Sequence, residues 1–577
     1  MGREIKYIFD NSNLNESYSG VTTPLTYSFA KRAYERVYIN FCKLLGVSNK
    51  DMKLNSDLFP NMLEYLGGRM YYNLINWYRL VALLPGYKFN RKFLEQMMGV
   101  DREHFYQPAR KSNPIEKSVD FLNFMYRIFK VASSFLLMKL LVRRFNKDFD
   151  EKFSYLNRVN FTSKKDKELV KFYENFENKL TKDFSIPIVN DFAVMVSVGV
   201  LKTLASKWLD DKAGSEASYL ISGGIGLKSS EPGKAIQEIV RAINTNPKPK
   251  RLFSSETPEK ILSTLTSDNS FSEIKRKVYH YIENYGSRMP GELKLESISF
   301  QDNPLVLIKI LKNSLNNKVQ VTKKFPKVAV EKEFNKLSWI KKRVFNIALK
   351  WAQSSIAMRE ETRFKRTLIF GLARRVFKEF GERLRSQDRL GNADEVFYLT
   401  VDEIFGYFRN KGEQEFSFSK VVQTRKRLNE VWKNIDLPRR ITTDLTPEEY
   451  DKDLLAAGDE GLRLKSNKVK VLGQLASLGN FGSVVIAESL VVVDFDPNKD
   501  YTDKILVTKQ TDPGWTIIFP SLRGLVVERG GALSHAAIVA REFGIPCIIN
   551  ATGATKLIPN ETEIKMNLKQ GAVTLNG

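Results

Sequence analysis

One histidine near the C-terminal end of the sequence stands where a side chain can carry out group transfer. His535 follows Gly530, Gly531 and Ser534, and the chain contains only 3 histidines. A neutral imidazole nitrogen is a competent nucleophile near neutral pH. Glycines allow backbone angles that are closed to other residues, and Ser534 is suited to cap a helix that begins at His535. The pattern predicts a nucleophilic histidine at a helix N-terminus, able to carry a phosphoryl group.

The flanking residues predict the elements that hold this histidine. Residues 524–528 are typical of a buried strand, and residues 547–549 of the strand that follows the helix. Gly544 is expected to end the helix as its C-cap, because Pro546 blocks any continuation. A helix N-terminus offers unpaired N–H groups and a partial positive charge, which both stabilise an anion. Arg541, about one and a half turns further on, is a further candidate for contact with phosphate.

A second set of candidates is a series of arginines in the middle of the chain. Arg359, Arg363 and Arg366, with Arg374 beyond them, fall within a narrow arc of a helix at 3.6 residues per turn. Clustered guanidinium groups suit a phosphate or a carboxylate, which they bind bidentately. A solvated helix face with ion pairs to Glu360 and nearby acids explains the same series. On the residues alone, the solvated face is the simpler interpretation.

Composition limits the class of protein. With 577 residues, of which 42% are hydrophobic, the chain is long enough for more than one globular core. The net charge of +25 comes from scattered lysines and arginines, so we expect an acidic substrate or partner and no nucleic-acid partner. We expect no membrane partner, since no stretch of roughly 20 unbroken apolar residues is present. Cys42 and Cys547 give neither a disulfide framework nor a metal-ligand spacing, so we expect no metal site and a cytoplasmic protein.

The residue pattern changes near residue 470, from one typical of helices to one typical of strands. Residues 1–440 are predicted to be mainly helical, and residues 441–469 are predicted to be a linker. Residues 470–577 are predicted to form a small β-rich α/β domain in which glycines separate the strands. The fold class we expect is therefore a large mainly α-helical domain followed by a small α/β domain. A second, proline- and lysine-containing linker is expected at 244–250. Apolar residues of helical period run through 27–45, 60–84, 115–145, 166–182, 191–210, 336–380 and 418–434.

The run GGALSHAAIVAREFGIP at 530–546 resembles the phosphohistidine swivelling domain of the phosphoenolpyruvate-utilising enzymes. This family includes phosphoenolpyruvate synthase, pyruvate phosphate dikinase and rifampicin phosphotransferase, and nearly every position of its signature is met. The segment TDPGWT at 511–516 resembles the one that precedes the signature in the family. Asn567 is a departure, because the family often has Asp-Gly there. A thinner resemblance, to the central helical domain of rifampicin phosphotransferase-like proteins, covers most of the remaining chain.

The resemblance implies roles for individual residues. It assigns residues 470–577 to the swivelling domain and 1–440 to a helical domain that binds the acceptor. The residues implied in catalysis are His535 as carrier, with Ser534, Gly530, Gly531 and Arg541 placed around the phosphate. The residues implied in binding the acceptor, or in stabilising the transferring group, are Arg359, Arg363, Arg366, Glu16 and Thr23.

The resemblance also implies a phosphoryl donor. Full-length relatives begin with an ATP-grasp domain that makes the phosphohistidine from ATP, and we recognise no equivalent in this sequence. We therefore expect a separately encoded ATP-grasp subunit that brings Mg2+ and ATP, no cofactor held for certain by this chain, and a small-molecule acceptor. Two alternatives stay open: a phosphorylation-dependent binding or regulatory protein, and a pseudoenzyme without small-molecule turnover. The intact histidine motif argues against the pseudoenzyme.

Overall fold

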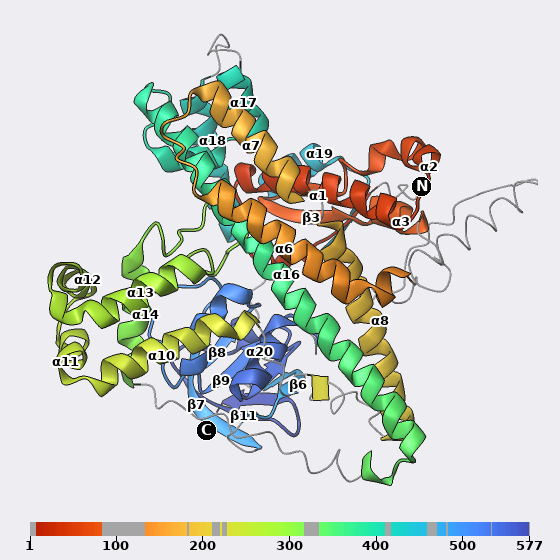
Figure 1. Ribbon diagram of the computed structural model, residues 1–577, viewed down its shortest axis with the longest axis vertical. Coiled ribbons are helices and arrows are strands. Elements are labelled where there is room, and N and C mark those ends of the chain that lie inside the picture. The colour runs from red at the N-terminus through yellow and green to blue at the C-terminus, as the bar shows by residue number, and fades with distance from the viewer. Residues whose placement is uncertain are drawn as a thin grey trace, which may run out of the picture. The chain divides into compact units, whose positions relative to one another are not determined.

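The structure is a computed structural model (Figure 1). It describes residues 7–83, 133–181, 184–209, 220–221, 228–316, 334–409, 417–457, 470–479, 483–531 and 534–575. The chain divides into two compact units, which are described separately. The first unit comprises Met1–Val196, Leu293–Glu296 and Leu368–Leu462, and the second comprises Ser197–Glu292, Ser297–Thr367 and Arg463–Gly577. The expected fold class is confirmed, since a large mainly helical region precedes a small α/β region. The expected domain boundaries at 440 and 470 stay predictions.

The first unit combines long helices with a small sheet. Its helices are α1 (Pro24–Leu44), α2 (Asn49–Leu54), α3 (Leu74–Ala82), α6 (Met138–Asn157), α7 (Asp166–Thr181), α17 (Val401–Arg409), α18 (Phe418–Asn434) and α19 (Pro447–Ala457), with the first part of α8 (Ser185–Trp208) and the last part of α16 (Trp339–Ser386). Its strands are β1 (Tyr7–Asp10), β2 (Leu63–Leu66), β3 (Arg69–Asn73) and β4 (Arg440–Thr443). They form an antiparallel sheet in the order β2-β3-β1-β4. Short 3-10 turns lie at Leu14–Glu16, Ser56–Leu58 and Ala393–Tyr398.

The prediction of a helix over residues 60–84 is wrong for its first half. Strands β2 and β3 form a hairpin there, and only α3 is helical. Gly67 and Gly68 have φ angles of +50° and +69°, which suit a two-residue turn that matches the twist of the strands. The apolar spacing around the turn is compatible with either period, so the glycine pair was the signal that distinguishes a hairpin.

The two expected linkers contain regular structure. Residues 244–250 hold the end of α10 (Glu231–Thr245) and the start of α11 (Pro247–Ser255), so the linker prediction is wrong there. Asn246 separates these helices and accepts a hydrogen bond from the Lys248 backbone N–H at 3.1 Å. Proline is tolerated in the first turn of a helix, where its missing N–H costs nothing. In the segment 441–469, β4 and α19 occupy most of the described part.

The second unit packs helices against an eight-stranded sheet. Its helices, besides the last part of α8 and the first part of α16, are α10, α11, α12 (Pro258–Ser267), α13 (Ser272–Tyr285), α14 (Pro304–Asn313), α20 (His535–Phe543) and α21 (Ala554–Leu557). Its strands are β5 (Lys470–Leu472), β6 (Gln474–Ser477), β7 (Val484–Val491), β8 (Ile505–Thr508), β9 (Gly524–Val527), β10 (Cys547–Ile549), β11 (Glu563–Asn567) and β12 (Ala572–Leu575). Short 3-10 turns lie at Lys228–Ser230, Asn269–Phe271, Ser314–Asn316, Pro513–Ile517 and Phe519–Ser521.

The centre of this sheet is parallel and buried on both faces. The order is β5-β12-β11-β7-β8-β9-β10-β6, with parallel pairing from β7 through β10. In β9, Leu525 and Val527 pack into one core together with α10, α13, α14 and α20, while Val526 packs into a second core on the other face. Burial on both faces explains the unbroken apolar runs of these strands. The shared core ties the helices of residues 231–313 to the sheet that carries α20.

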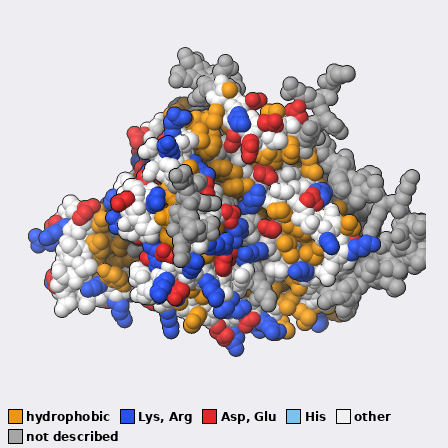
Figure 2. All heavy atoms as spheres, turned by 90° about the horizontal axis from the view of Figure 1, so that it is seen from above, with side chains coloured by type: hydrophobic (Ala, Val, Ile, Leu, Met, Phe, Trp, Pro, Cys, Tyr) orange, Lys and Arg blue, Asp and Glu red, His pale blue; other side chains and the backbone are white. Residues whose placement is uncertain are grey.

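The visible surface carries mixed charges, and one long apolar stretch of the chain is half buried. Figure 2 shows lysine and arginine side chains interspersed with acidic ones over the visible face, as on an ordinary solvated surface. One stretch between Asp166 and Trp208 has the length and mean hydropathy, 1.8, of a membrane-crossing helix, but half of its apolar window is buried in the protein. A core helix meets the same criteria of length and composition, so this stretch does not identify a membrane span.

Candidate functional site

The glycine turn and the helix cap place His535 as the sequence predicts. The Ser534 hydroxyl accepts a hydrogen bond from the Ala537 backbone N–H at 3.4 Å, and α20 begins at His535. Gly544 ends the helix in the left-handed conformation, with φ +67°. Gly530 has φ +128°, and a Cβ added there would lie 3.0 Å from the Ser534 hydroxyl oxygen. The backbone of the turn therefore requires glycine at 530, whereas Gly531 is exposed.

The imidazole of His535 is buried, with 3% of its side chain exposed, and its two nitrogens differ. Nε2 lies 3.0 Å from the hydroxyl oxygen of Thr516. Since that hydroxyl donates its single hydrogen to the Pro513 carbonyl at 2.7 Å, its oxygen accepts the hydrogen of Nε2. Nδ1 therefore holds the lone pair. It has no hydrogen-bond partner within the described part of the chain and lies 4.0 Å from Glu360 Oε2.

The surroundings keep this imidazole neutral. Burial lowers the pKa of His535 to about 3, Glu360 acts in the opposite direction, and the charges of Arg288, Arg363 and Arg359 lower it further. At neutral pH the ring is thus unprotonated at one nitrogen, which is the form that attacks phosphorus.

Glu360 is a buried carboxylate that accepts no hydrogen bond from the described residues. Its side chain is 1% exposed, and Arg363 Nη1 lies 3.8 Å from Oε1. Burial opposes ionisation, but Arg363, followed by His535, Arg359 and Arg288, holds the pKa of Glu360 below its usual range. A buried carboxylate that is kept ionised by nearby arginines, with no hydrogen bond from the described residues, is a candidate for a chemical role.

Arg288 and Glu292 belong to the same cluster, and the sequence analysis missed both. Arg288, 1% exposed, donates from Nη1 to Glu292 Oε1 at 3.1 Å and to the Thr367 hydroxyl oxygen at 3.3 Å. Burial raises the pKa of Glu292, although Arg288 acts against this. The available signal was an arginine and a glutamate four residues apart in the turn RMPGE at 288–292, directly after an amphipathic helix.

Close backbone contacts hold this turn against the C-terminal α/β region. The Gly291 N–H donates to Asp512 Oδ2 at 2.7 Å. A Cβ added at Gly514 would lie 1.9 Å from the Met289 carbonyl carbon, so a larger residue at 514 does not fit. On α20, Glu542 accepts from the Ser230 hydroxyl at 2.6 Å. These contacts explain why His535 is buried beside the 288–292 turn and α16.

The predicted arginines separate into different environments. Arg359 and Arg363 act electrostatically on both His535 and Glu360, and Arg366 acts on Glu292, so these three face the cluster. Arg374 belongs to the first unit, where it donates to the Leu295 carbonyl and lies 4.9 Å from the Phe397 ring centroid. Arg541 is 2% exposed, and its Nε donates to the Ala476 carbonyl on β6 at 2.7 Å. Its assignment to phosphate contact stays a prediction.

Glu16 and Thr23 lie in the first unit. Thr23 occupies the N-cap position of α1, but its hydroxyl makes no capping bond with the described backbone. It donates instead to Glu296 Oε2 at 2.9 Å, and the Thr26 hydroxyl donates to the same oxygen at 2.6 Å. Glu16 ends a short 3-10 turn. The expected place of Glu16 and Thr23 in the acceptor cleft stays a prediction.

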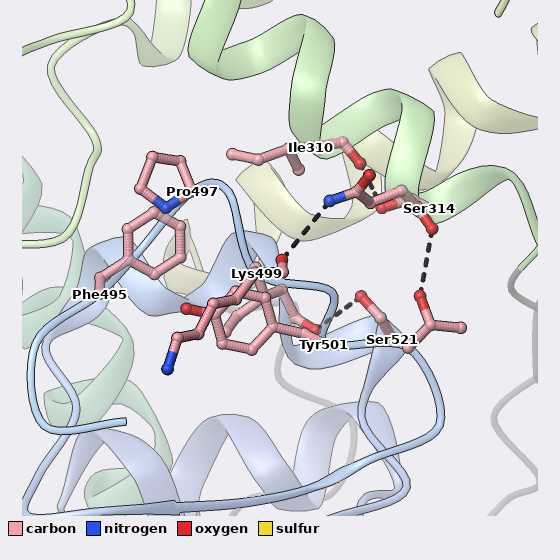
Figure 3. Close-up of a pocket in the computed structure, with 10 residues that line it drawn as sticks. Ile310, Ser314, Phe495, Pro497, Lys499, Tyr501 and Ser521 are labelled. Atoms are coloured by element: carbon pink, nitrogen blue, oxygen red, sulfur yellow. Dashed lines mark hydrogen bonds between the residues drawn. The ribbon is translucent and has the colours of Figure 1, made fainter. Parts of the chain in front are cut away.

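A hollow between α14 and the 495–502 loop is a poor candidate for a site (Figure 3). Three of its polar side chains are hydrogen-bonded to backbone carbonyls: Ser314 to that of Ile310, Thr502 to that of Asn313 and Ser521 to that of Ile518. Among the described residues there is also no group of three or more His, Cys, Asp or Glu side chains placed to hold a metal.

Comparison with known proteins matches two segments of the chain. Residues 501–571 match the mobile domain of PEP-utilising enzymes, and residues 188–360 match the fourth domain of rifampicin phosphotransferase. The two segments contain His535 and Thr516 on one side, and Arg288, Glu292 and Glu360 on the other.

Whole-length relatives are distant. Rifampicin phosphotransferase of Bacillus subtilis is 25% identical over 386 residues, which are 64% of this chain and 42% of the relative. The enzyme of the same name from Bacillus cereus is 23% identical over 396 residues, 64% of this chain and 43% of the relative. The prodigiosin synthesizing transferase PigC of Serratia marcescens is 23% identical over 359 residues, 60% and 39% respectively. The chain thus spans less than half the length of these relatives.

Proposed function

We propose that this chain, which matches the mobile domain of PEP-utilising enzymes over residues 501–571, is a phosphotransferase component that carries a phosphoryl group on His535. The observation that carries the proposal is the environment of the imidazole. A neutral, buried histidine directs a lone pair toward an ionised carboxylate and a group of arginines. Such an arrangement serves a nucleophile that accepts and releases a strongly anionic group.

Transfer to an acceptor hydroxyl involves two bonds and one proton. The N–P bond of phosphorylated His535 breaks, an O–P bond to the acceptor forms, and the hydroxyl proton passes to Glu360. The arginines hold the pKa of Glu360 down in the unphosphorylated chain. A phosphoryl dianion offsets their charge, so Glu360 becomes a stronger base when the phosphoryl group is present. Arg359 and Arg363 stabilise the charge on the transferring group.

The donor we propose is a separate ATP-grasp subunit that uses ATP and Mg2+, as the family resemblance implies. Since 97% of the His535 side chain is covered in the docked arrangement, the α/β region has to leave the 288–292 turn and α16 before a second protein can reach the imidazole. The acceptor is a small molecule. The names of the relatives identify rifampicin for two of them and do not identify the acceptor of this chain.

The test is a two-step transfer. The chain is labelled with [β-32P]ATP, Mg2+ and the candidate ATP-grasp subunit, freed of nucleotide, and then mixed with a panel of hydroxyl compounds. We expect the label to leave the wild-type chain and appear in one compound, and to stay on the chain in Glu360→Gln. A chain that keeps its label with every compound, with or without Glu360, is a phosphorylated regulator and contradicts the proposal.

A further inference from the structure

The guanidinium of Arg288 has one engaged end and one edge without a partner. Nη1 donates to Glu292 and to the Thr367 hydroxyl. Nε and Nη2 are buried, and neither has a hydrogen-bond partner in the described part of the chain. Leaving buried donors of a charged group unpaired is costly. Because Nε–H and an Nη–H lie side by side, this edge has the geometry that binds two oxygens of a phosphate or carboxylate.

The position of this edge is fixed in advance. The Phe364 ring lies with its centroid 5.3 Å from Arg288 Cζ, which restricts the guanidinium plane. Glu292 and Thr367 hold the Nη1 end, and the neighbouring Gly291 N–H is bonded to Asp512. A donor pair that is already oriented loses little entropy when it binds an oxyanion.

The charge of the cluster matches that of a phosphoryl group. Arg288, Arg359 and Arg363 act on His535 and Glu360, and Arg366 acts on Glu292. With His535 neutral, these four guanidinium groups outnumber the two carboxyl groups of the cluster, Glu360 and Glu292. A phosphate monoester or phosphoryl group near pH 7 carries about −1.5 to −2. One such group therefore adds negative charge beside the arginines and supplies oxygens for the unpaired donors of Arg288.

We propose that Arg288 is an oxyanion-binding residue of the transfer site, with Nε–H and Nη2–H holding two oxygens of the phosphoryl group beside His535. Glu292 is its positioning residue, since it fixes the opposite end of the guanidinium. The inference rests on the proposed function for the origin of the phosphoryl group. The binding of a free oxyanion follows from the residues themselves and is tested separately.

The experiment is equilibrium dialysis of the full chain with [32P]phosphate near neutral pH, and with [14C]acetate in a parallel arm. We expect one phosphate per wild-type chain and at least roughly tenfold weaker binding in Arg288→Met, because a bidentate charge-assisted contact is lost. Arg276→Met, which removes an exposed arginine from α13, is the matched control and is expected to bind like the wild type. Arg288→Lys, which keeps the charge but not the donor pair, is expected to bind more weakly than the wild type.

Folding is controlled by a second variant. Removal of Arg288 alone leaves Glu292 as an unpaired buried charge, so Arg288→Met is also made together with Glu292→Gln, which removes both charges. The double variant is expected to keep the wild-type unfolding midpoint within a few degrees and still lose phosphate. Phosphate binding that survives in this folded variant overturns the inference, as does a wild-type chain that binds no phosphate or prefers acetate.

Failure of this inference is distinguishable from failure of the proposed function. If the donor labels His535 but phosphate binding does not depend on Arg288, only the inference about Arg288 is contradicted. If phosphate binding depends on Arg288 but His535 never takes up label, the carrier function is contradicted. The oxyanion site at Arg288 then remains.

Discussion

Two carboxylates of this chain show what separates a structural group from a functional one. Glu296, in the first unit, accepts hydrogen bonds from the Thr23 backbone N–H at 3.1 Å and from the hydroxyls of Thr23 and Thr26. Glu360, in the second unit, is 1% exposed and accepts none from the described residues. The first arrangement stabilises the native state, because each donor and acceptor is paired. The second leaves both carboxylate oxygens without a hydrogen-bond donor among the described residues, and these oxygens have a use when a further group enters.

Glu360 and Glu296 are expected to differ most in their effect on the rate of phosphoryl transfer. We expect Glu360→Gln to slow the release of phosphate from labelled His535 to an acceptor by about 100-fold or more, because the amide cannot take the hydroxyl proton. The matched variant Glu296→Gln is expected to stay within about twofold of the wild type. Single-turnover loss of label measures both. Equal losses in the two variants would remove the distinction between these carboxylates.

The free energy of unfolding is expected to change more in Glu296→Gln than in Glu360→Gln, the reverse of the order expected for the transfer rate. Glu296→Gln replaces charge-assisted hydrogen bonds with weaker ones and turns an amide NH2 toward a donor, so we expect a loss of about 2 kcal/mol in the free energy of unfolding. Glu360→Gln is expected to change it by less than about 1 kcal/mol, since the removed desolvation cost offsets the lost attraction to the arginines. Urea unfolding of both variants tests this, and a larger loss for Glu360→Gln would contradict it.

The buried imidazole predicts a pH dependence of stability. The pKa of His535 is lowered to about 3 in the folded chain, while an unfolded histidine titrates near 6.5. As the pH falls, the unfolded state therefore binds the proton before the folded state does. The free energy of unfolding is unaffected by this group above about pH 6.5 and decreases progressively from there toward pH 3. At pH 5 the loss is about 2 kcal/mol.

The control for this dependence is His535→Asn. Glu292 contributes with the opposite sign, because its pKa is raised, so the quantity to compare is the difference between wild type and variant. Urea midpoints at pH 7.5 and pH 5 should show a steeper fall for the wild type. Parallel falls would mean that His535 is accessible and titrates normally.

A smaller effect is expected at Thr516, which holds the Nε2 side of the imidazole. Thr516→Val keeps the shape but removes the oxygen that accepts the Nε2 hydrogen, so both tautomers become populated. We expect phosphorylation of His535 to slow by about tenfold, an effect of orientation rather than chemistry. Thr562→Val, at a partly exposed position directly before β11, is the control. Unchanged kinetics in Thr516→Val would show that the hydroxyl does not orient the ring.

The parts of the site that follow from local sequence could be predicted. The cap at Ser534, the start of α20 at His535 and its end at Gly544 depend on neighbouring residues, and all are confirmed. The β2–β3 hairpin was missed because its apolar spacing fits a helix, and only Gly67 and Gly68 mark the turn. Local signals thus gave the position of the histidine but not its surroundings.

The surroundings of His535 depend on contacts between distant segments. Gly291 and Asp512, which bond the 288–292 turn to the α/β region, are 221 positions apart. Without that contact, Arg288 and Glu292 are an ordinary i, i+4 pair, and Glu360 is one of many acids beside arginines. The arginine series was predicted as one set, yet Arg374 lies in the first unit, since a helix of 48 residues passes through two environments.

The most direct measurement is the location of phosphate on the chain. Purified chain is incubated with Mg2+ and ATP labelled at either the β or the γ phosphate, with and without the candidate ATP-grasp subunit, and the acid-labile, base-stable label is mapped. The account predicts label on His535 that requires the subunit and is absent in a folded His535→Ala variant. No label on His535 under any condition, including with phosphoenolpyruvate as donor, would contradict it.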